Sequence, residues 1–280
     1  MGKFLKVYKD FSGGLCEDAN DNMKDNQLVS AINTVPGERY GLKRAGGTAI
    51  AFPAQTPDTG EIKALLDFKP AGQPIQTLCF TGKNFYKWDS TVVQWALIAP
   101  LSHPLRDYFV YGGNLYWLNG VDMQIYDGSA VAPAALSNSN PSAELIGRWN
   151  KVKASSFVEQ RGQRWYYAQE NDNWVVFSEV GKPCEMNLSN MINVNTKNAD
   201  TITGLKEFSE GILIFKAKSV HYLTGWDFIN SADLKLSQLN VTSGTLYDKS
   251  IQVVENAVLY LGYNGVYQLS LPYYTTAIAS

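Results

Sequence analysis

The sequence predicts an all-β protein, and two observations carry this prediction: its composition and the spacing of its turns. Of the 280 residues 45% are hydrophobic, and 16 Tyr, 12 Phe and 7 Trp accompany 23 Gly. Aromatic and β-branched residues favour strands, whereas Gly, Asn and Asp favour the tight turns that join strands. A chain of this length buries most of its apolar surface without disulfides, so a single large β domain is expected.

The clearest structural unit lies at residues 202–241. Short apolar runs at 202–208, 212–215 and 219–223 are separated by turns at Ser209-Glu210-Gly211 and Ala217-Lys218. A fourth run at 234–241 alternates apolar and polar residues and shifts phase at Leu239, as a β-bulge does. This pattern predicts an antiparallel sheet of four strands.

Four further copies of this unit are expected along the chain. Their turns include Gly112-Gly113-Asn114, Asn119-Gly120 and Asn264-Gly265, whose residues tolerate positive φ in tight hairpins. The expected strands are 62–68, 77–80, 85–88 and 92–98 in the first copy, and 106–111, 115–118 and 123–126 in the second. They are 154–159, 164–169 and 174–179 in the third, and 250–254, 258–262 and 266–271 in the last. The stretch 132–143, rich in Ser, Asn, Pro and Ala, is expected to be a linker.

The spacing of the copies predicts a β-propeller. Their first turns, at Gly82, Gly113, Gly162, Gly211 and Asn256, are separated by 31, 49, 49 and 45 residues, which is the length of a propeller blade. The sequence therefore predicts about five to six four-stranded blades, and a β-sandwich is the alternative. The last copy shows only three strands, so either an N-terminal strand supplies its fourth or the chain is cut short.

Residues 1–47 stand outside the repeat, and residues 48–280 are assigned to the propeller. After an expected strand near the start, Ser12-Gly13-Gly14 breaks the chain. Asp25 or Asn26 can cap a short helix with Leu28, Ile32 and Val35 on one face, which Pro36-Gly37 ends. A basic, Gly-rich segment follows and contains Arg39, Lys43 and Arg44.

The residues that carry chemistry do not form a catalytic or metal-binding pattern. The 24 Lys and Arg nearly balance the 26 Asp and Glu, which disfavours general attraction to nucleic acid or an anionic membrane. Cys16, Cys79 and Cys184 lack metal-ligand spacing and are expected to be buried free thiols. His103 and His221 have no ligand at metal-binding spacing and are expected to be structural. We therefore expect no enzymatic activity, no cofactor and no metal, and no apolar segment is long enough to insert in a membrane.

Aromatic clusters on the expected strands allow two interpretations. They could pack between blades, or they could form a platform that binds sugar. The clusters are Tyr108-Phe109-Tyr111, Tyr116-Trp117 and Trp165-Tyr166-Tyr167.

The chain resembles the β-propeller proteins of bacteriophage virions, which include tail nozzle, tail tube and head-to-tail stabilisation proteins of short-tailed phages. The opening DFSGGLCEDANDNMKDNQLVSAINTVPGERYGLKRAGG carries this resemblance, together with VVFSEVGKPCEMN, DTITGLKEFSEGILIFKAKSVHYLTG and LYLGYNGVYQLS. The resemblance implies a structural subunit of the neck or tail that is made in the bacterial host cytoplasm. It also implies a homo-oligomeric ring, for which sixfold symmetry is one expectation, around the channel through which DNA leaves.

This resemblance implies contacts with portal, adaptor and tail proteins, and transient passage of DNA without specific binding. The expected partner interface lies in the N-terminal segment and comprises Phe11, Gly13, Gly14, Asn33, Arg39, Lys43 and Arg44. Two alternatives belong to a different class: a carbohydrate- or receptor-binding propeller at the tail tip, and a propeller scaffold unrelated to viruses.

Overall fold

The computed structural model describes residues 34–36, 42–44, 55–194, 200–225, 231–270 and 274–279. The chain divides into two compact units, Met1–Pro53 and Ala54–Ser280. In the first unit, strand β1 (Thr34–Pro36) pairs antiparallel with β2 (Leu42–Arg44). The helix predicted to run through Val35 is therefore wrong at its end, because Val35 and Pro36 lie in β1. A β-branched residue favours this extended backbone. The rest of the predicted helix lies outside the described residues.

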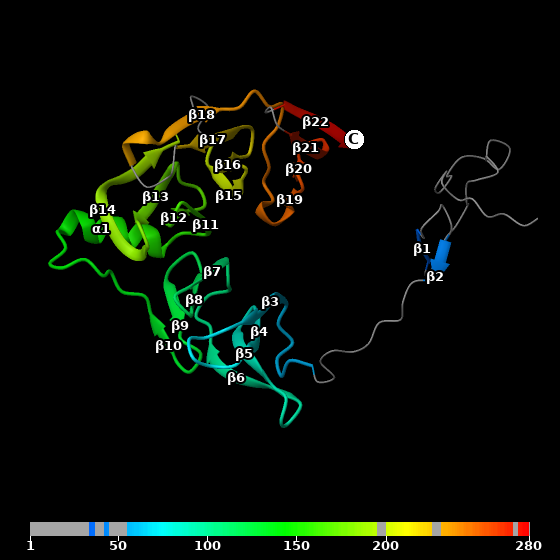
Figure 1. Ribbon diagram of the computed structural model, residues 1–280, viewed down its shortest axis with the longest axis vertical. Coiled ribbons are helices and arrows are strands. Elements are labelled where there is room, and N and C mark those ends of the chain that lie inside the picture. Colours follow the sequence, from blue (N-terminus) through cyan, green and yellow to red (C-terminus); the bar gives the residue numbers. More distant parts are fainter. Residues whose placement is uncertain are drawn as a thin grey trace, which may run out of the picture. The chain divides into compact units, whose positions relative to one another are not determined.

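The second unit contains five four-stranded antiparallel sheets, each built from strands consecutive in the chain (Figure 1). Sheet 1 contains β3 (Ile62–Phe68), β4 (Gln76–Thr81), β5 (Asn84–Asp89) and β6 (Gln94–Pro100). Sheet 2 contains β7 (Asp107–Tyr111), β8 (Asn114–Leu118), β9 (Met123–Tyr126) and β10 (Val131–Pro133). Sheet 3 contains β11 (Phe157–Arg161), β12 (Arg164–Ala168), β13 (Trp174–Glu179) and β14 (Lys182–Asn193).

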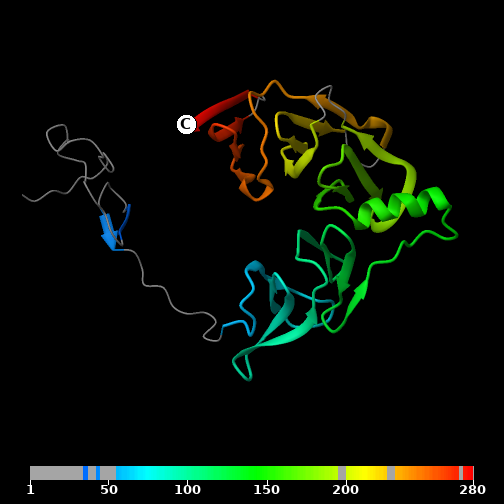
Figure 2. The same cartoon turned by 180° about the vertical axis from the view of Figure 1, so that it is seen from behind.

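Sheet 4 contains β15 (Ile202–Phe208), β16 (Gly211–Lys216), β17 (Val220–Thr224) and β18 (Lys235–Gln238). Sheet 5 contains β19 (Gln252–Val254), β20 (Ala257–Gly262), β21 (Gly265–Ser270) and β22 (Tyr274–Ala279). The five sheets follow one another around a common axis, with the first strand of each on the inner side (Figures 1 and 2). This arrangement is a five-bladed β-propeller, so the predicted fold class is confirmed and the β-sandwich alternative is excluded.

Apolar side chains pack between successive sheets and hold the blades together. Between sheets 1 and 2, Phe80 stacks on Phe85 at 4.2 Å and the Trp117 ring lies 5.4 Å from Phe80. Equivalent clusters join sheets 2 and 3, sheets 3 and 4, and sheets 4 and 5. Because each buried aromatic or aliphatic side chain contributes about 1.5–3 kcal/mol, these clusters are the main source of stability. Among the described residues, none of the clusters joins sheet 5 to sheet 1.

The predicted glycine turns are explained by backbone conformation. Gly112 and Gly113, between β7 and β8, have φ of 60° and 76°, which only glycine adopts at little cost. A Cβ on Gly113 would also lie 2.7 Å from the backbone nitrogen of Ala71, so glycine lets this hairpin approach sheet 1 closely.

The second unit also contains a helix that the sequence did not lead us to expect, α1 (Ala143–Lys153). It begins at Ser142, whose side-chain oxygen accepts a hydrogen bond of 3.2 Å from the backbone N–H of Leu145. Leu145, Trp149 and Val152 lie on one face and are buried in the cluster between sheets 2 and 3. The helix therefore fills space between two blades, directly after the segment predicted to be a linker.

The expectation that the last copy lacks its own fourth strand is wrong. Strand β22 completes sheet 5 by pairing antiparallel with β21, with Ser270 opposite Tyr274. Strands β10 and β14, the fourth strands of sheets 2 and 3, were likewise not predicted. The predicted strand at 234–241 is shorter in the structure, because β18 ends at Gln238.

Candidate functional site

The structure describes the backbone of only two residues of the partner interface predicted in the N-terminal segment, and it does not test that interface. Lys43 and Arg44 lie in β2, where their backbones pair with those of Val35 and Thr34. The remaining predicted residues, Phe11, Gly13, Gly14, Asn33 and Arg39, lie outside the described residues. The grouping of these residues into one interface stays a prediction.

In the propeller unit, a polar site lies at one end of the inner strands. Two adjoining cavities of about 500 and 400 Å³ share part of their lining. We call five polar residues of this lining the inner site: Lys63, Arg106, Glu170, Asn171 and Lys249. The inner site joins residues that are far apart in the sequence, because sheets 1, 2 and 3 and the 3-10 helix η4 (Asp248–Ser250) each contribute to it.

The charged groups of the inner site form exposed ion pairs. Arg106 Nη2 lies 3.5 Å from Glu170 Oε2, and these side chains are 55% and 47% exposed. Lys249 lies 3.4 Å from Asp248 Oδ2, and its Nζ also donates a hydrogen bond of 2.8 Å to the carbonyl oxygen of Arg106. Exposed pairs such as these contribute about 0–1 kcal/mol each. The contact between Lys249 and Arg106 nevertheless connects the start of sheet 5 to the start of sheet 2.

Asp107, at the start of β7, has the most perturbed carboxyl group near the inner site. Its Oδ2 accepts a hydrogen bond of 2.9 Å from the backbone N–H of Val158, and its Oδ1 accepts one of 3.0 Å from Tyr108. Burial raises the pKa of Asp107 to about 6, although the charge of Lys249 and both hydrogen bonds act in the opposite direction. Because both oxygens already accept backbone hydrogen bonds, this carboxyl group links sheet 2 to sheet 3.

A second polar cluster is buried in sheet 4 and includes His221. Ser219 Oγ lies 3.4 Å from both His221 Nε2 and Asp200 Oδ2. Asp200 therefore contacts the serine and not the histidine, so these residues do not have the order of a catalytic triad. Burial is the main cause that lowers the pKa of His221, and the charge of Lys216 lowers it further.

Lys216 stabilises this buried cluster. Its side chain is fully buried, and its Nζ donates hydrogen bonds to Asn173 Oδ1 at 2.6 Å, to the carbonyl oxygen of Asp200 at 2.8 Å and to that of Val194. Burial lowers the pKa of Lys216. Since Asp200 also accepts hydrogen bonds from the backbone of the β16–β17 turn, the cluster fixes this hairpin to the end of sheet 3.

The other histidine and the cysteines occupy different environments. His103 is exposed and lines the larger inner cavity, with Nδ1 3.3 Å from Ser102 Oγ. Cys79 is buried and Cys184 is half-buried, and both are free thiols whose pKa burial raises. Cys16 lies outside the described residues. In the part of the chain that the structure describes, there is no group of three or more His, Cys, Asp or Glu that could hold a metal ion.

The tryptophans and tyrosines of β8 and β12 serve the blades and do not form a sugar platform, whereas Tyr108 and Tyr111 of β7 are 38% and 37% exposed. Trp117, Trp165, Tyr166 and Tyr167 are at most 1% exposed and lie in the clusters between sheets. The interpretation of these residues as a carbohydrate-binding surface is therefore wrong. They pack because alternate residues of β8 and β12 face the neighbouring sheets.

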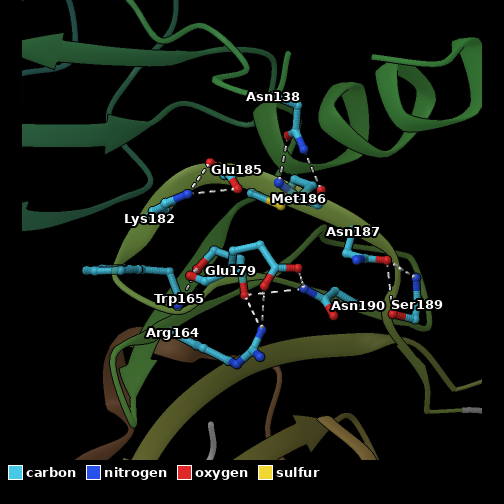
Figure 3. Close-up of polar contacts among 11 residues, drawn as sticks. Asn138, Arg164, Trp165, Glu179, Lys182, Glu185, Met186, Asn187, Ser189 and Asn190 are labelled. Atoms are coloured by element: carbon cyan, nitrogen blue, oxygen red, sulfur yellow. Dashed lines mark hydrogen bonds and ion pairs between the residues drawn. The ribbon is translucent and has the colours of Figure 1, made fainter. Parts of the chain in front are cut away.

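A third polar network anchors the irregular outer strand of sheet 3 (Figure 3). The side-chain amide of Asn138 forms two hydrogen bonds of 2.9 Å with the backbone of Met186, one to its oxygen and one from its nitrogen. On the inner side of the strand, Asn190 Nδ2 donates a bond of 2.9 Å to Glu179 Oε1, and Arg164 lies 3.8 Å from Glu179 Oε2. The Asn190 contact holds β14 to β13 where the pairing register shifts, and the Asn138 contacts hold β14 to the segment that precedes α1.

Comparisons with known proteins identify the fold alone. No protein-family model and no curated protein matches the chain. The extracellular domain of a putative hybrid two-component system from B. thetaiotaomicron is similar in structure, with a TM-score of 0.51 and 10% identity over 86% of this chain and 32% of that chain. PorZ, a bacterial surface component of the type-IX secretion system of Porphyromonas gingivalis, has a TM-score of 0.47 and 10% identity over 78% of this chain. This chain covers 28% of PorZ.

At such identities, similarity concerns the arrangement of strands and not the activity. The WD40 domain of Neurospora crassa Pan2 has a TM-score of 0.42 and 12% identity over 82% of this chain and 84% of that one. Among the described helices, none is long and apolar enough to cross a membrane.

Proposed function

We propose that the chain is a non-catalytic structural protein of a bacteriophage virion, a head-to-tail adaptor or a subunit of the tail nozzle or tube. The observation that carries the proposal is the resemblance of residues 10–47 and of the later blades to virion propeller proteins. In this proposal, several copies form a ring with the portal, adaptor and tail proteins, around the DNA exit channel.

The propeller has physical properties suited to such a role. Aromatic clusters between successive sheets make it resist local opening, because a blade cannot separate without exposing them. The inner site pairs its cations with carboxylates, and the chain carries 24 basic against 26 acidic residues. A surface with balanced charge gains little from neutralising phosphates, so it allows DNA to pass without trapping it.

The polar groups of the described residues also fit a structural role. Asp107 accepts two backbone hydrogen bonds, and Lys216 donates to three oxygens. Each therefore links neighbouring sheets, as a structural side chain does.

Antibody labelling of purified particles tests the proposal. Electron microscopy is expected to find label at the head-to-tail junction or along the tail nozzle. Label confined to the distal tip would favour receptor binding, and particles without label would favour a propeller scaffold unrelated to virions. Either result would contradict the proposal.

The role of the N-terminal segment is tested by deletion and by charge reversal. Deleting residues 1–47 is expected to give particles that lack a sealed neck. The double variant Lys43→Glu and Arg44→Glu is also expected to weaken assembly of the neck. Lys83→Glu, which reverses the charge of an exposed lysine in the propeller, is the control. Normal assembly after the deletion would remove the interface from this segment.

A further inference from the structure

A cavity larger than those of the inner site lies at the rim of sheets 4 and 5. Its volume is about 830 Å³, compared with about 500 and 400 Å³ for the inner cavities, and it shares only Ala217 and Leu246 with their lining. Three segments enclose it: the β16–β17 turn, the connection from β18 to η4, and the β20–β21 hairpin. We call it the rim pocket. A volume of this size lies within the usual range for small-molecule sites.

Exposed tyrosine and leucine side chains and one buried tyrosine line the rim pocket. Tyr263 is 90% exposed, Leu246 64% and Tyr247 57%, whereas Tyr267 is 6% exposed and closes the pocket from the side of sheet 5. A ligand bound in the rim pocket would remove the first three from water. A tyrosine ring offers an apolar face and a polar hydroxyl group, which suits ligands that are themselves amphipathic.

The wall of the rim pocket is held in place by hydrogen bonds to the backbone. Thr245 donates from its backbone N–H to the carbonyl oxygen of Lys216 at 3.0 Å, and from Oγ1 to that of Leu261 at 2.6 Å. The hydroxyl group of Tyr260 donates a bond of 2.8 Å to the carbonyl oxygen of Ser243. A Cβ on Gly244 would collide with the Lys216 carbonyl oxygen, so this segment lies directly against the β16–β17 hairpin. A preformed wall lowers the entropy lost when a ligand binds.

The hairpin that carries Tyr263 is joined to the same wall. Ser243 Oγ accepts a hydrogen bond of 3.3 Å from the backbone N–H of Tyr263 and donates one of 2.9 Å to the Gly244 carbonyl oxygen. Tyr263 is therefore exposed on an anchored backbone.

The charge of the rim pocket selects the ligand further. Lys218 is the one charged residue in its lining, and no Asp or Glu belongs to that lining. Its side chain is exposed and forms no ion pair with another described residue. A lone ammonium group beside an apolar surface complements a ligand that carries one anionic group.

We propose that the rim pocket binds an acidic saccharide, a sugar bearing a carboxylate such as a uronic or sialic acid. The apolar C–H face of the ring packs on Tyr263, the carboxylate faces Lys218, and the exposed Asn264 amide and Thr242 hydroxyl groups hydrogen-bond to sugar hydroxyls. A proline-rich peptide also packs on tyrosines, but it lacks the anionic group that this lining complements. The proposal is independent of the virion role, because a propeller of any origin could use this site.

A glycan array printed with uronate- and sialate-containing oligosaccharides and their neutral counterparts tests the proposal with the full chain. Binding to acidic glycans is expected, and it should weaken as the salt concentration rises. Tyr263→Ala is expected to lower affinity about 10-fold, since a lost aromatic contact of about 1.4 kcal/mol corresponds to that factor. Lys218→Gln is expected to abolish the preference for acidic over neutral glycans.

Two control variants remove matched side chains outside the rim pocket. Tyr108→Ala truncates a tyrosine that is 38% exposed on sheet 2, and Lys69→Gln neutralises an exposed lysine after β3. Both are expected to bind like the original chain, and thermal unfolding checks that all four variants are folded. Absence of binding to any acidic glycan, equal binding by Tyr263→Ala, or binding of a proline-rich peptide library in place of glycans would overturn the proposal.

Discussion

Substitution of Asp107 by Asn is expected to change how the stability of the propeller depends on pH. In the folded protein, burial raises the pKa of Asp107 from its ordinary value of 3.8 to about 6. At pH values between 3.8 and about 6, Asp107 therefore holds a proton in the folded state that it has lost in the unfolded state. The free energy of unfolding contributed by Asp107 is therefore fully present below about pH 4 and is lost as the pH rises through about 6.

The size of this effect follows from the pKa. One pKa unit corresponds to about 1.4 kcal/mol, so the rise from 3.8 to about 6 gives an upper limit of about 3 kcal/mol. Asn has no proton to lose. The free energy of unfolding of Asp107→Asn, relative to the original chain, is therefore expected to increase by up to about 3 kcal/mol from about pH 4 to about pH 7. The substitution also lowers the free energy of unfolding by an amount that does not depend on pH, because the Asn amide nitrogen cannot accept one of the two backbone hydrogen bonds.

Urea unfolding at several pH values measures both quantities, and the change with pH is the diagnostic one. Asp127→Asn is the matched control in the same sheet, because hydrogen bonds from the backbone of Ala130 and Ser129 lower the pKa of Asp127. Its stabilising contribution is present above its ordinary pKa and is lost as the pH falls. A relative stability of Asp107→Asn that stays constant or falls between about pH 4 and about pH 7 would refute the reasoning.

Three further substitutions test the packing and the buried polar groups by urea unfolding. Trp117→Ala should cost about 3–5 kcal/mol because it opens a cavity between sheets 1 and 2, and a cost below about 1 kcal/mol would contradict that packing. Lys216→Met should cost about 3 kcal/mol by removing the donor to three oxygens, two of them buried, and an unchanged stability would show that these bonds contribute nothing. Ser142→Ala should cost about 1 kcal/mol because it removes the cap of α1, whereas Ser142→Asp should keep most of the stability that the cap provides. A Ser142→Ala variant as stable as the original chain would show that the cap contributes nothing.

Local patterns were sufficient to predict most strands. Hairpins with two-residue turns, such as Gly112-Gly113 and Ser209-Glu210, repeat at the spacing of a blade, and each has alternating or continuous apolar runs on both sides. Strands without such signals were missed. β10 has three residues and ends in Pro133, and β14 contains extra residues that are held in place by its own Asn190 and, from a distant part of the sequence, by Asn138.

The helix α1 could have been predicted from Ser142 followed by Leu145, Trp149 and Val152, which have helical spacing. It was missed because the preceding residues resemble a linker. The inner site and the rim pocket could not be predicted in this way. Their residues come from turns of different sheets, so only the packing of the blades brings them together.

Single-particle electron microscopy of phage particles that carry this chain would decide whether it is a structural subunit of the neck or nozzle. We expect a ring of density at that position, around the channel, into which copies of the five-sheet propeller fit blade by blade. Propeller density only at the distal tip, or particles complete at the neck and nozzle without this chain, would contradict the virion role.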